Sequence, residues 1–149
     1  FIHLLITLDL ISKLIAEQYL EFGKSVPLIP IIDFLLVYNS GIAFSILDIN
    51  NKMLSFGLSI LGLLIVGYLN ALYRVQKSSI YQVSFILIIS GAMGNILDRL
   101  ADGVVTDFLY LHIGSISFFV FNLADAFISI GAALFLIMEL KKYLYNSEP

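Results

Sequence analysis

Cysteine and tryptophan are both absent from the 149 residues of this sequence. The lack of cysteine excludes disulfides, thiolate metal sites and a cysteine nucleophile. Without tryptophan, tyrosine must supply any aromatic belt at a membrane interface. Charged residues are scarce as well, at 13% compared with about 25% in a typical soluble domain. The few basic residues form no cluster that could bind phosphates, so we expect no nucleic acid partner.

Hydrophobic residues dominate what remains, at 60% of the chain with a mean hydropathy of +0.98. A membrane-spanning helix needs roughly 20 mainly apolar residues, and four segments come close to that length. They are Phe1–Tyr19, Met53–Tyr73, Ile80–Leu97 and Phe118–Leu140. The sequence therefore predicts an all-α integral membrane protein, a single domain over residues 1–149 with four transmembrane helices. Because the chain starts inside an apolar run, we expect the native N-terminus to be missing.

The basic residues near the segment ends predict the orientation in the membrane. They follow the second and fourth segments, as Arg74, Lys77, Lys141 and Lys142. The positive-inside rule assigns these regions to the cytoplasm. Both termini are then cytoplasmic, and the connections Glu21–Lys52 and Asp98–Ser117 lie outside.

The first outer connection has the character of β structure. Pro27 and Pro30 argue against a continuous helix. The following "DFLLVYNSG", Asp33–Gly41, is short, favours strands and ends in turn residues. A sheet with open edges cannot lie in hydrocarbon. We therefore expect a small extracytoplasmic β element between helices 1 and 2, resting on the outer membrane surface.

Two polar clusters interrupt the apolar segments. Asp9 and Lys13 are four residues apart and share one helix face, either as a structural ion pair in the bundle interior or as support for a polar site. In "GAMGNILDR", Gly91 and Gly94 suit close helix packing. Asn95, Asp98 and Arg99 follow on nearby faces, which indicates a site or a structural network near the outer interface. Arg99 could hold a carboxylate or carbonyl through two parallel hydrogen bonds.

Two further aspartates fall on the outer side of the predicted membrane. Asp107 follows a β-like stretch, and Asp125 begins the last apolar segment three residues after Asn122. Taken singly, Asn122 could be a helix N-cap and Asp125 a carboxylate stabilised by the helix dipole. Their common location favours a shared site. His3 and His112 lack partners in sequence, so we assign no metal ligands.

Five blocks of sequence, in order along nearly the whole chain, resemble the motifs of the lipoprotein signal peptidases (type II signal peptidases) of bacterial inner membranes. The blocks are Asp9 and Lys13; Asn39, Gly41, Ala43 and Phe44; Gly91, Gly94, Asn95, Asp98 and Arg99; Gly103, Val105, Asp107 and Phe108; and Phe121, Asn122, Ala124 and Asp125. The chain departs from common family residues at Leu10, Ile42, Ser90 and Phe119. None of these departures removes a charged or amide group from the expected site.

The resemblance implies an aspartic endopeptidase of the bacterial cytoplasmic membrane that needs no metal or cofactor. Its substrates would be diacylglyceryl-modified prolipoproteins, cut just before the lipidated cysteine, and globomycin would inhibit it. Asp107 and Asp125 would form the catalytic pair. The supporting and substrate-binding residues would be Asp9, Lys13, Asn39, Gly41, Asn95, Arg99 and Asn122. The β element, over Ser25–Ile46, would cradle the substrate, and we expect a monomer surrounded by membrane lipids.

Two other functions compete with this interpretation. An ion-coupled transporter could use intramembrane charges as a proton relay, but most charges here lie toward one surface. A scaffold packed through Gly91 and Gly94 would need no pair of facing aspartates.

Overall fold

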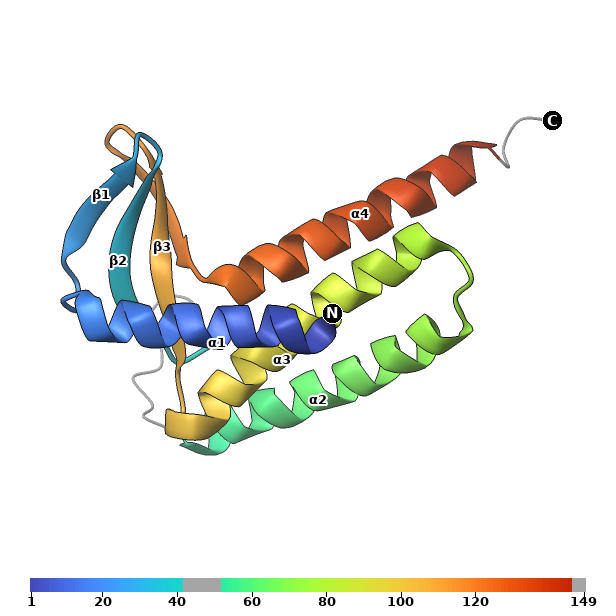
Figure 1. Cartoon of the computed structure of the whole chain (residues 1–149), viewed down its shortest axis with the longest axis horizontal. Coiled ribbons are helices and arrows are strands. Elements are labelled where there is room, and N and C mark those ends of the chain that lie inside the picture. The colour runs from blue at the N-terminus through green and yellow to red at the C-terminus, as the bar shows by residue number, and fades with distance from the viewer. Residues whose placement is uncertain (42–51, 146–149) are drawn as a thin grey trace.

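A computed structural model of the chain describes residues 1–41 and 52–145. These residues form four helices and two β-hairpins, in the order helix, hairpin, two helices, hairpin, helix (Figure 1). The helices are α1 (Ile2–Tyr19), α2 (Lys52–Val75), α3 (Ser79–Asp102) and α4 (Leu123–Tyr145). The strands are β1 (Ser25–Ile29), β2 (Ile32–Asn39), β3 (Val105–Ile113) and β4 (Ile116–Phe121). The motif residues Ala43 and Phe44, and the end of the expected cradle, lie outside the described residues.

Helix α3 is the centre of the helical layer, because it packs against α1, α2 and α4. Small residues permit the close approach of α3 and α4. A side chain at Gly91 would meet the backbone oxygen of Ala124, and one at Gly131 would come within 2.8 Å of the backbone oxygen of Ser84. The packing role predicted for Gly91 is therefore present. Gly103 ends α3 with a left-handed backbone, φ 97°, and donates its N–H to the Arg99 carbonyl.

Three of the described helices, α2, α3 and α4, are long and apolar enough to cross a membrane. Helix α1 does not meet the same description, since its 18 residues include the charged Asp9, Lys13 and Glu17. The prediction of four spans is thus supported for three helices. The all-α fold class was wrong, because the chain is a mixed helix and sheet protein.

The four strands form one antiparallel sheet in the order β1-β2-β3-β4. The predicted β element was therefore too small, since β3 and β4 come from the second outer connection. Residues 118–121, predicted as helix, belong to β4, and α4 begins at Leu123. A short apolar run carries no periodicity that separates a strand from the start of a helix. Pro27 is tolerated in β1 because β1 is an edge strand.

The sheet lies at the end of the helical layer where α1 ends and α4 begins (Figure 1). The α2–α3 connection and the last turns of α4 lie at the opposite end. Strand β2 pairs with β3 so that Val37 is opposite Asp107 and Asn39 is opposite Val105. This pairing brings residues from the connection between α1 and α2 next to residues from the connection between α3 and α4, at the point where the sheet meets the helices.

Candidate active site

Asp107 lies on β3 with only 3% of its surface exposed. Both of its carboxylate oxygens accept hydrogen bonds from side-chain amides. The Nδ2 of Asn122 donates to Oδ1 at 2.6 Å, and the Nδ2 of Asn39 donates to Oδ2 at 3.0 Å. Asn39 reaches Asp107 because it is its diagonal neighbour on the adjacent strand. The carboxylate is therefore fixed from both sides.

Asp125 lies in the first turn of α4, where a reciprocal capping arrangement holds it. The Oδ1 of Asn122 accepts the backbone N–H of Asp125 at 2.9 Å, and Oδ2 of Asp125 accepts the backbone N–H of Asn122 at 3.3 Å. This is the geometry of a capping box. The other oxygen of Asp125 accepts the Nδ2 of Asn95 at 2.8 Å. These donors fix the Asp125 carboxylate at the N-terminus of α4.

Asn122 connects the two aspartates. Its oxygen caps α4 at Asp125, and its amide nitrogen donates to Asp107. Asn122 is thus the helix cap that was considered for it, and the same side chain is also part of the polar cluster. Burial raises the pKa of Asp107 to about 6, and the Asp125 charge adds to this while the Asn39 hydrogen bond opposes it. A raised carboxyl pKa beside a second carboxylate is the environment in which one proton is shared.

Lys13 is the centre of a buried charge cluster behind Asp125. Its Nζ lies 2.9 Å from Oδ2 of Asp9, 3.1 Å from Oδ2 of Asp98 and 2.8 Å from Oδ1 of Asn95. The amide of Asn95 thereby links Lys13 to Asp125. The ion pair predicted from the spacing of Asp9 and Lys13 is therefore present, and Asn95 connects it to Asp125.

Asp9 joins α1 to the start of α4. Its Oδ1 accepts the backbone N–H of Ala124 at 2.8 Å, which suits a carboxylate at a helix N-terminus. Gly94 leaves room for this contact, because a Cβ there would lie 2.5 Å from Oδ2 of Asp9. Gly94 therefore accommodates the charge cluster as well as helix packing.

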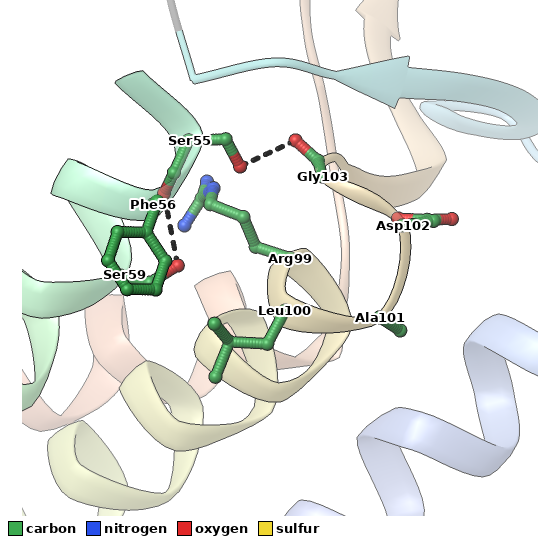
Figure 2. A pocket seen from close by; sticks show the side chains of 8 residues that line it. All are labelled: Ser55, Phe56, Ser59, Arg99, Leu100, Ala101, Asp102 and Gly103. Carbon is green, nitrogen blue, oxygen red and sulfur yellow. Dashed lines mark hydrogen bonds between the residues drawn. The ribbon is translucent and has the colours of Figure 1, made fainter. Parts of the chain in front are cut away.

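Arg99 extends from α3 into a cavity of about 270 Å³ between the start of α2 and the end of α3 (Figure 2). Ser55 and Ser59 of α2 also line this cavity. The hydroxyl of Ser55 donates to the Gly103 carbonyl at 2.7 Å, and that of Ser59 donates to the Ser55 carbonyl at 3.1 Å. Within the described part of the chain, the buried Nε of Arg99 has no hydrogen-bond partner. The Arg99 side chain thus lines the cavity together with the serines of α2.

Gly41 turns the chain directly after Asn39. Its N–H donates to Oδ1 of Asn39 at 2.8 Å, and its φ of 90° is one that other residues rarely adopt. A Cβ at Gly41 would lie 2.5 Å from Cδ1 of Leu58 and 3.6 Å from a terminal nitrogen of Arg99. The turn therefore fixes Asn39 and brings the backbone close to Arg99.

Sequence reasoning missed two residues next to this site, Thr106 and Glu17. Thr106 is fully buried, and its hydroxyl donates to Oε1 of Glu17 at 2.8 Å. The spacing of Asp9, Lys13 and Glu17 by four residues each was a usable signal, because it places all three on one face of α1. Nothing in the sequence indicated that Thr106, 89 residues away, is the partner.

The arrangement suits acid–base catalysis at an uncharged carbonyl group. Two carboxylates share Asn122, and each is held by fixed amides. Among residues 1–41 and 52–145, no group of three or more His, Asp or Glu side chains could hold a metal ion. The side chains present can activate water and protonate a carbonyl oxygen.

Comparisons with known proteins point in one direction. The sequence profile of the family described as signal peptidase (SPase) II matches residues 1–141. The lipoprotein signal peptidase of Aquifex aeolicus is 41% identical over 142 residues, which cover 93% of this chain and 80% of that protein. That of Thermodesulfovibrio yellowstonii is 38% identical, covering 95% of this chain and 92% of that protein. A solved bacterial membrane enzyme superposes with a TM-score of 0.79 at 28% identity, covering 99% of this chain and 90% of that one.

Proposed function

The chain belongs to the signal peptidase II family, and from that premise we propose that Asp107 and Asp125 are its catalytic pair. The protein is a membrane enzyme, an aspartic peptidase that cleaves signal peptides from prolipoproteins. The observation that carries the assignment of the pair is that Asn122 makes two hydrogen bonds: its amide nitrogen donates to Asp107, and its oxygen accepts the backbone N–H of Asp125.

In the proposed mechanism, Asp125 is the base and Asp107 the acid. Two donors and the N-terminus of α4 favour a negative charge on Asp125. The raised pKa of Asp107, about 6, suits the group that keeps the shared proton. Asp125 takes a proton from water, and the water oxygen attacks the scissile carbonyl carbon. Asp107 gives its proton to the carbonyl oxygen. As the C–N bond breaks, Asp125 passes the proton that it took from water to the leaving amine, and Asp107 takes a proton back from a hydroxyl of the tetrahedral intermediate.

Arg99 and Asn39 have different roles in this proposal. Asn39 was expected to hold the substrate backbone, but its amide nitrogen is bonded to Asp107 and its oxygen to Gly41. We assign it to fixing the acid. Arg99 lines the cavity between α2 and α3 and is the better candidate for a substrate carbonyl near the scissile bond.

The proposed substrate carries diacylglycerol on the cysteine that follows the scissile bond. The carboxylate pair lies where the helices meet the sheet, so a lipid buried beside the helices would hold that cysteine at the depth of the pair. Burial of the acyl chains contributes roughly 0.8 kcal/mol per methylene. Binding of the substrate therefore depends strongly on its lipid.

We expect purified protein in detergent to cleave a diacylglyceryl-modified prolipoprotein peptide, and the same peptide without lipid at least about a hundredfold more slowly at equal concentration. A gel shift of the released peptide measures both rates, and globomycin should block the faster one. A peptide with the lipid but with a bulky residue at the position before the cysteine serves as a control for sequence recognition. Equal rates with and without the lipid would contradict the proposed substrate.

For the bacterial cytoplasmic membrane we propose four spans, with α1 as the first, and both termini in the cytoplasm. In α1 the charges of Asp9 and Lys13 are buried against α3, while Leu4, Leu8, Ile11 and Ile15 are exposed and apolar. A helix with this distribution can face lipid on its exposed side. The sheet and the carboxylate pair then lie at the outer face, and the protein acts as a monomer.

Because the chain has no cysteine, single Ser→Cys variants test this orientation directly. In intact cells, Ser25→Cys in β1 should react with a membrane-impermeant maleimide, and Ser78→Cys between α2 and α3 should not. Both should react once the membrane is permeabilised, which controls for local accessibility. The reverse pattern would overturn the proposed orientation and the outer location of the site.

A further inference from the structure

Thr106, the residue before Asp107, is bonded to three different helical segments. Its N–H donates to Oδ2 of Asp98 in α3 at 2.8 Å, and its hydroxyl donates to Oε1 of Glu17 in α1 at 2.8 Å. Its carbonyl accepts the Nδ2 of Asn122, at the start of α4, at 3.4 Å. Every polar group of this fully buried residue is therefore satisfied.

From this arrangement we infer that Glu17 is a positioning residue for catalysis, acting through Thr106 on Asp107. The inference rests on the proposed catalytic role of Asp107. Successive side chains of a strand point to opposite faces, so Thr106 points toward α1 while Asp107 points toward Asn39 and Asn122. A rotation of the backbone at Thr106 would turn Asp107 by a similar amount.

The hydrogen bond to Glu17 restrains this rotation on the side that the other two contacts leave free. Asp98 and Asn122 hold the backbone N–H and carbonyl of Thr106, and both are already part of the polar site. The hydrogen bond of the side-chain hydroxyl goes to Glu17. The β-branched side chain of Thr106 is stiff at χ1, so a fixed hydroxyl also fixes the Cα–Cβ direction of the strand at this point.

The acceptor oxygen of Glu17, and not its charge, is the property that this role uses. Glu17 is at the exposed outer end of α1, where solvent and salt screen its charge. The charge of Lys13 is closer to the pair than that of Glu17 in terms of contacts, because the amide of Asn95 links Lys13 to Asp125. A glutamine keeps an oxygen at the same place, whereas an alanine removes it.

The test compares kcat and KM for a lipidated peptide across two matched pairs of variants. Glu17→Ala and Thr106→Val remove the hydrogen bond, while Glu17→Gln and Thr106→Ser retain an acceptor and a hydroxyl. We expect kcat to fall by about ten- to a hundredfold in the first two variants, as for a catalytic group displaced by a fraction of an ångström. KM should change less than about threefold, and Gln and Ser should stay within about threefold of the parent kcat.

The double variant Glu17→Ala with Thr106→Val should be no slower than the slower single variant, since both remove the same bond. A parent-like kcat for Glu17→Ala would overturn the inference. So would a loss in Glu17→Gln equal to that in Glu17→Ala, accompanied by a shift of the alkaline limb of the pH profile, because that would indicate a role for the charge. Neither outcome would contradict the assignment of Asp107 and Asp125 as the catalytic pair. Full activity of Asp107→Asn, in contrast, would contradict the proposed function itself.

Discussion

Asp107→Asn and Asp125→Asn should each lower the cleavage rate of a lipidated prolipoprotein by roughly 10²- to 10⁴-fold, the usual contribution of a positioned acid or base. Asparagine is close to aspartate in size but cannot ionise or exchange a proton. The proposed chemistry needs both properties. Gel-shift cleavage by purified protein in detergent measures the loss.

The double variant should be about as inactive as either single one, because residues that act as a unit fail together. In the parent enzyme, the pH profile should report apparent pKa values that belong to the pair. Asp107 keeps its proton up to a pH of about 6, so kcat/KM should decline above that pH as the free enzyme loses the shared proton. Substantial cleavage by either single variant would sink the aspartic mechanism assigned to these two residues.

A matched control is available at the far tip of the sheet. Asp33 accepts the Ser25 hydroxyl at 2.6 Å and lies 3.1 Å from Nε2 of His112. Asp33→Asn is the same chemical change on the same sheet, and activity should remain near that of the parent. The control matters because Asp107→Asn turns an amide N–H toward Asn39 or Asn122, both of which already donate. Some loss of stability in Asp107→Asn is therefore expected, at about 1–3 kcal/mol for one unsatisfied group.

Lys13→Met should destabilise the protein by about 3–5 kcal/mol, the cost of leaving a buried charge without its partner. Lys13 is 2% exposed and Asp9 is fully buried. Methionine would fill the space but leave the carboxylates of Asp9 and Asp98 facing each other with no cation between them. We expect little folded protein in the membrane and a lowered thermal unfolding temperature in detergent.

Two further variants test whether the loss of stability comes from the uncompensated buried charge. Adding Asp9→Asn to Lys13→Met removes one of the uncompensated charges and should recover part of the stability. Lys24→Met is the control, since Lys24 pairs with Glu21 on the surface, where both side chains are more than 60% exposed; it should cost less than about 1 kcal/mol. If Lys13→Met unfolds at the parent temperature, the buried cluster does not stabilise the fold.

Local spacing predicted much of the site. The four-residue step from Asp9 to Lys13 predicted an ion pair, and the three-residue step from Asn122 to Asp125 predicted a helix cap. Both contacts are present. Each is made within one helix or its cap, where the geometry of the backbone determines which residues are neighbours.

Contacts between distant segments could not be read in the same way. The β2–β3 pairing that brings Asn39 to Asp107 depends on how two outer connections meet, and neither connection encodes the other's register. The start of α4 was placed too early because "FFVF", the last four residues of β4, is apolar throughout and leads directly into the apolar helix. The spacing of Gly91 and Gly94 suggested only packing, whereas Gly94 also makes room for the Asp9 carboxylate.

The long sequence separations within the polar site determine when activity can appear during synthesis. Asn39 and Asp107 are 68 residues apart, Lys13 and Asn95 are 82 apart, and Asp9 and Ala124 are 115 apart. Asp9 and Lys13 are therefore synthesised long before their partners in α3 and α4 exist, and contacts between residues so far apart in the sequence form late. On the proposed mechanism the carboxylate pair cannot assemble until α4 docks, so a nascent chain should be unable to cleave its neighbours before α4 is in place.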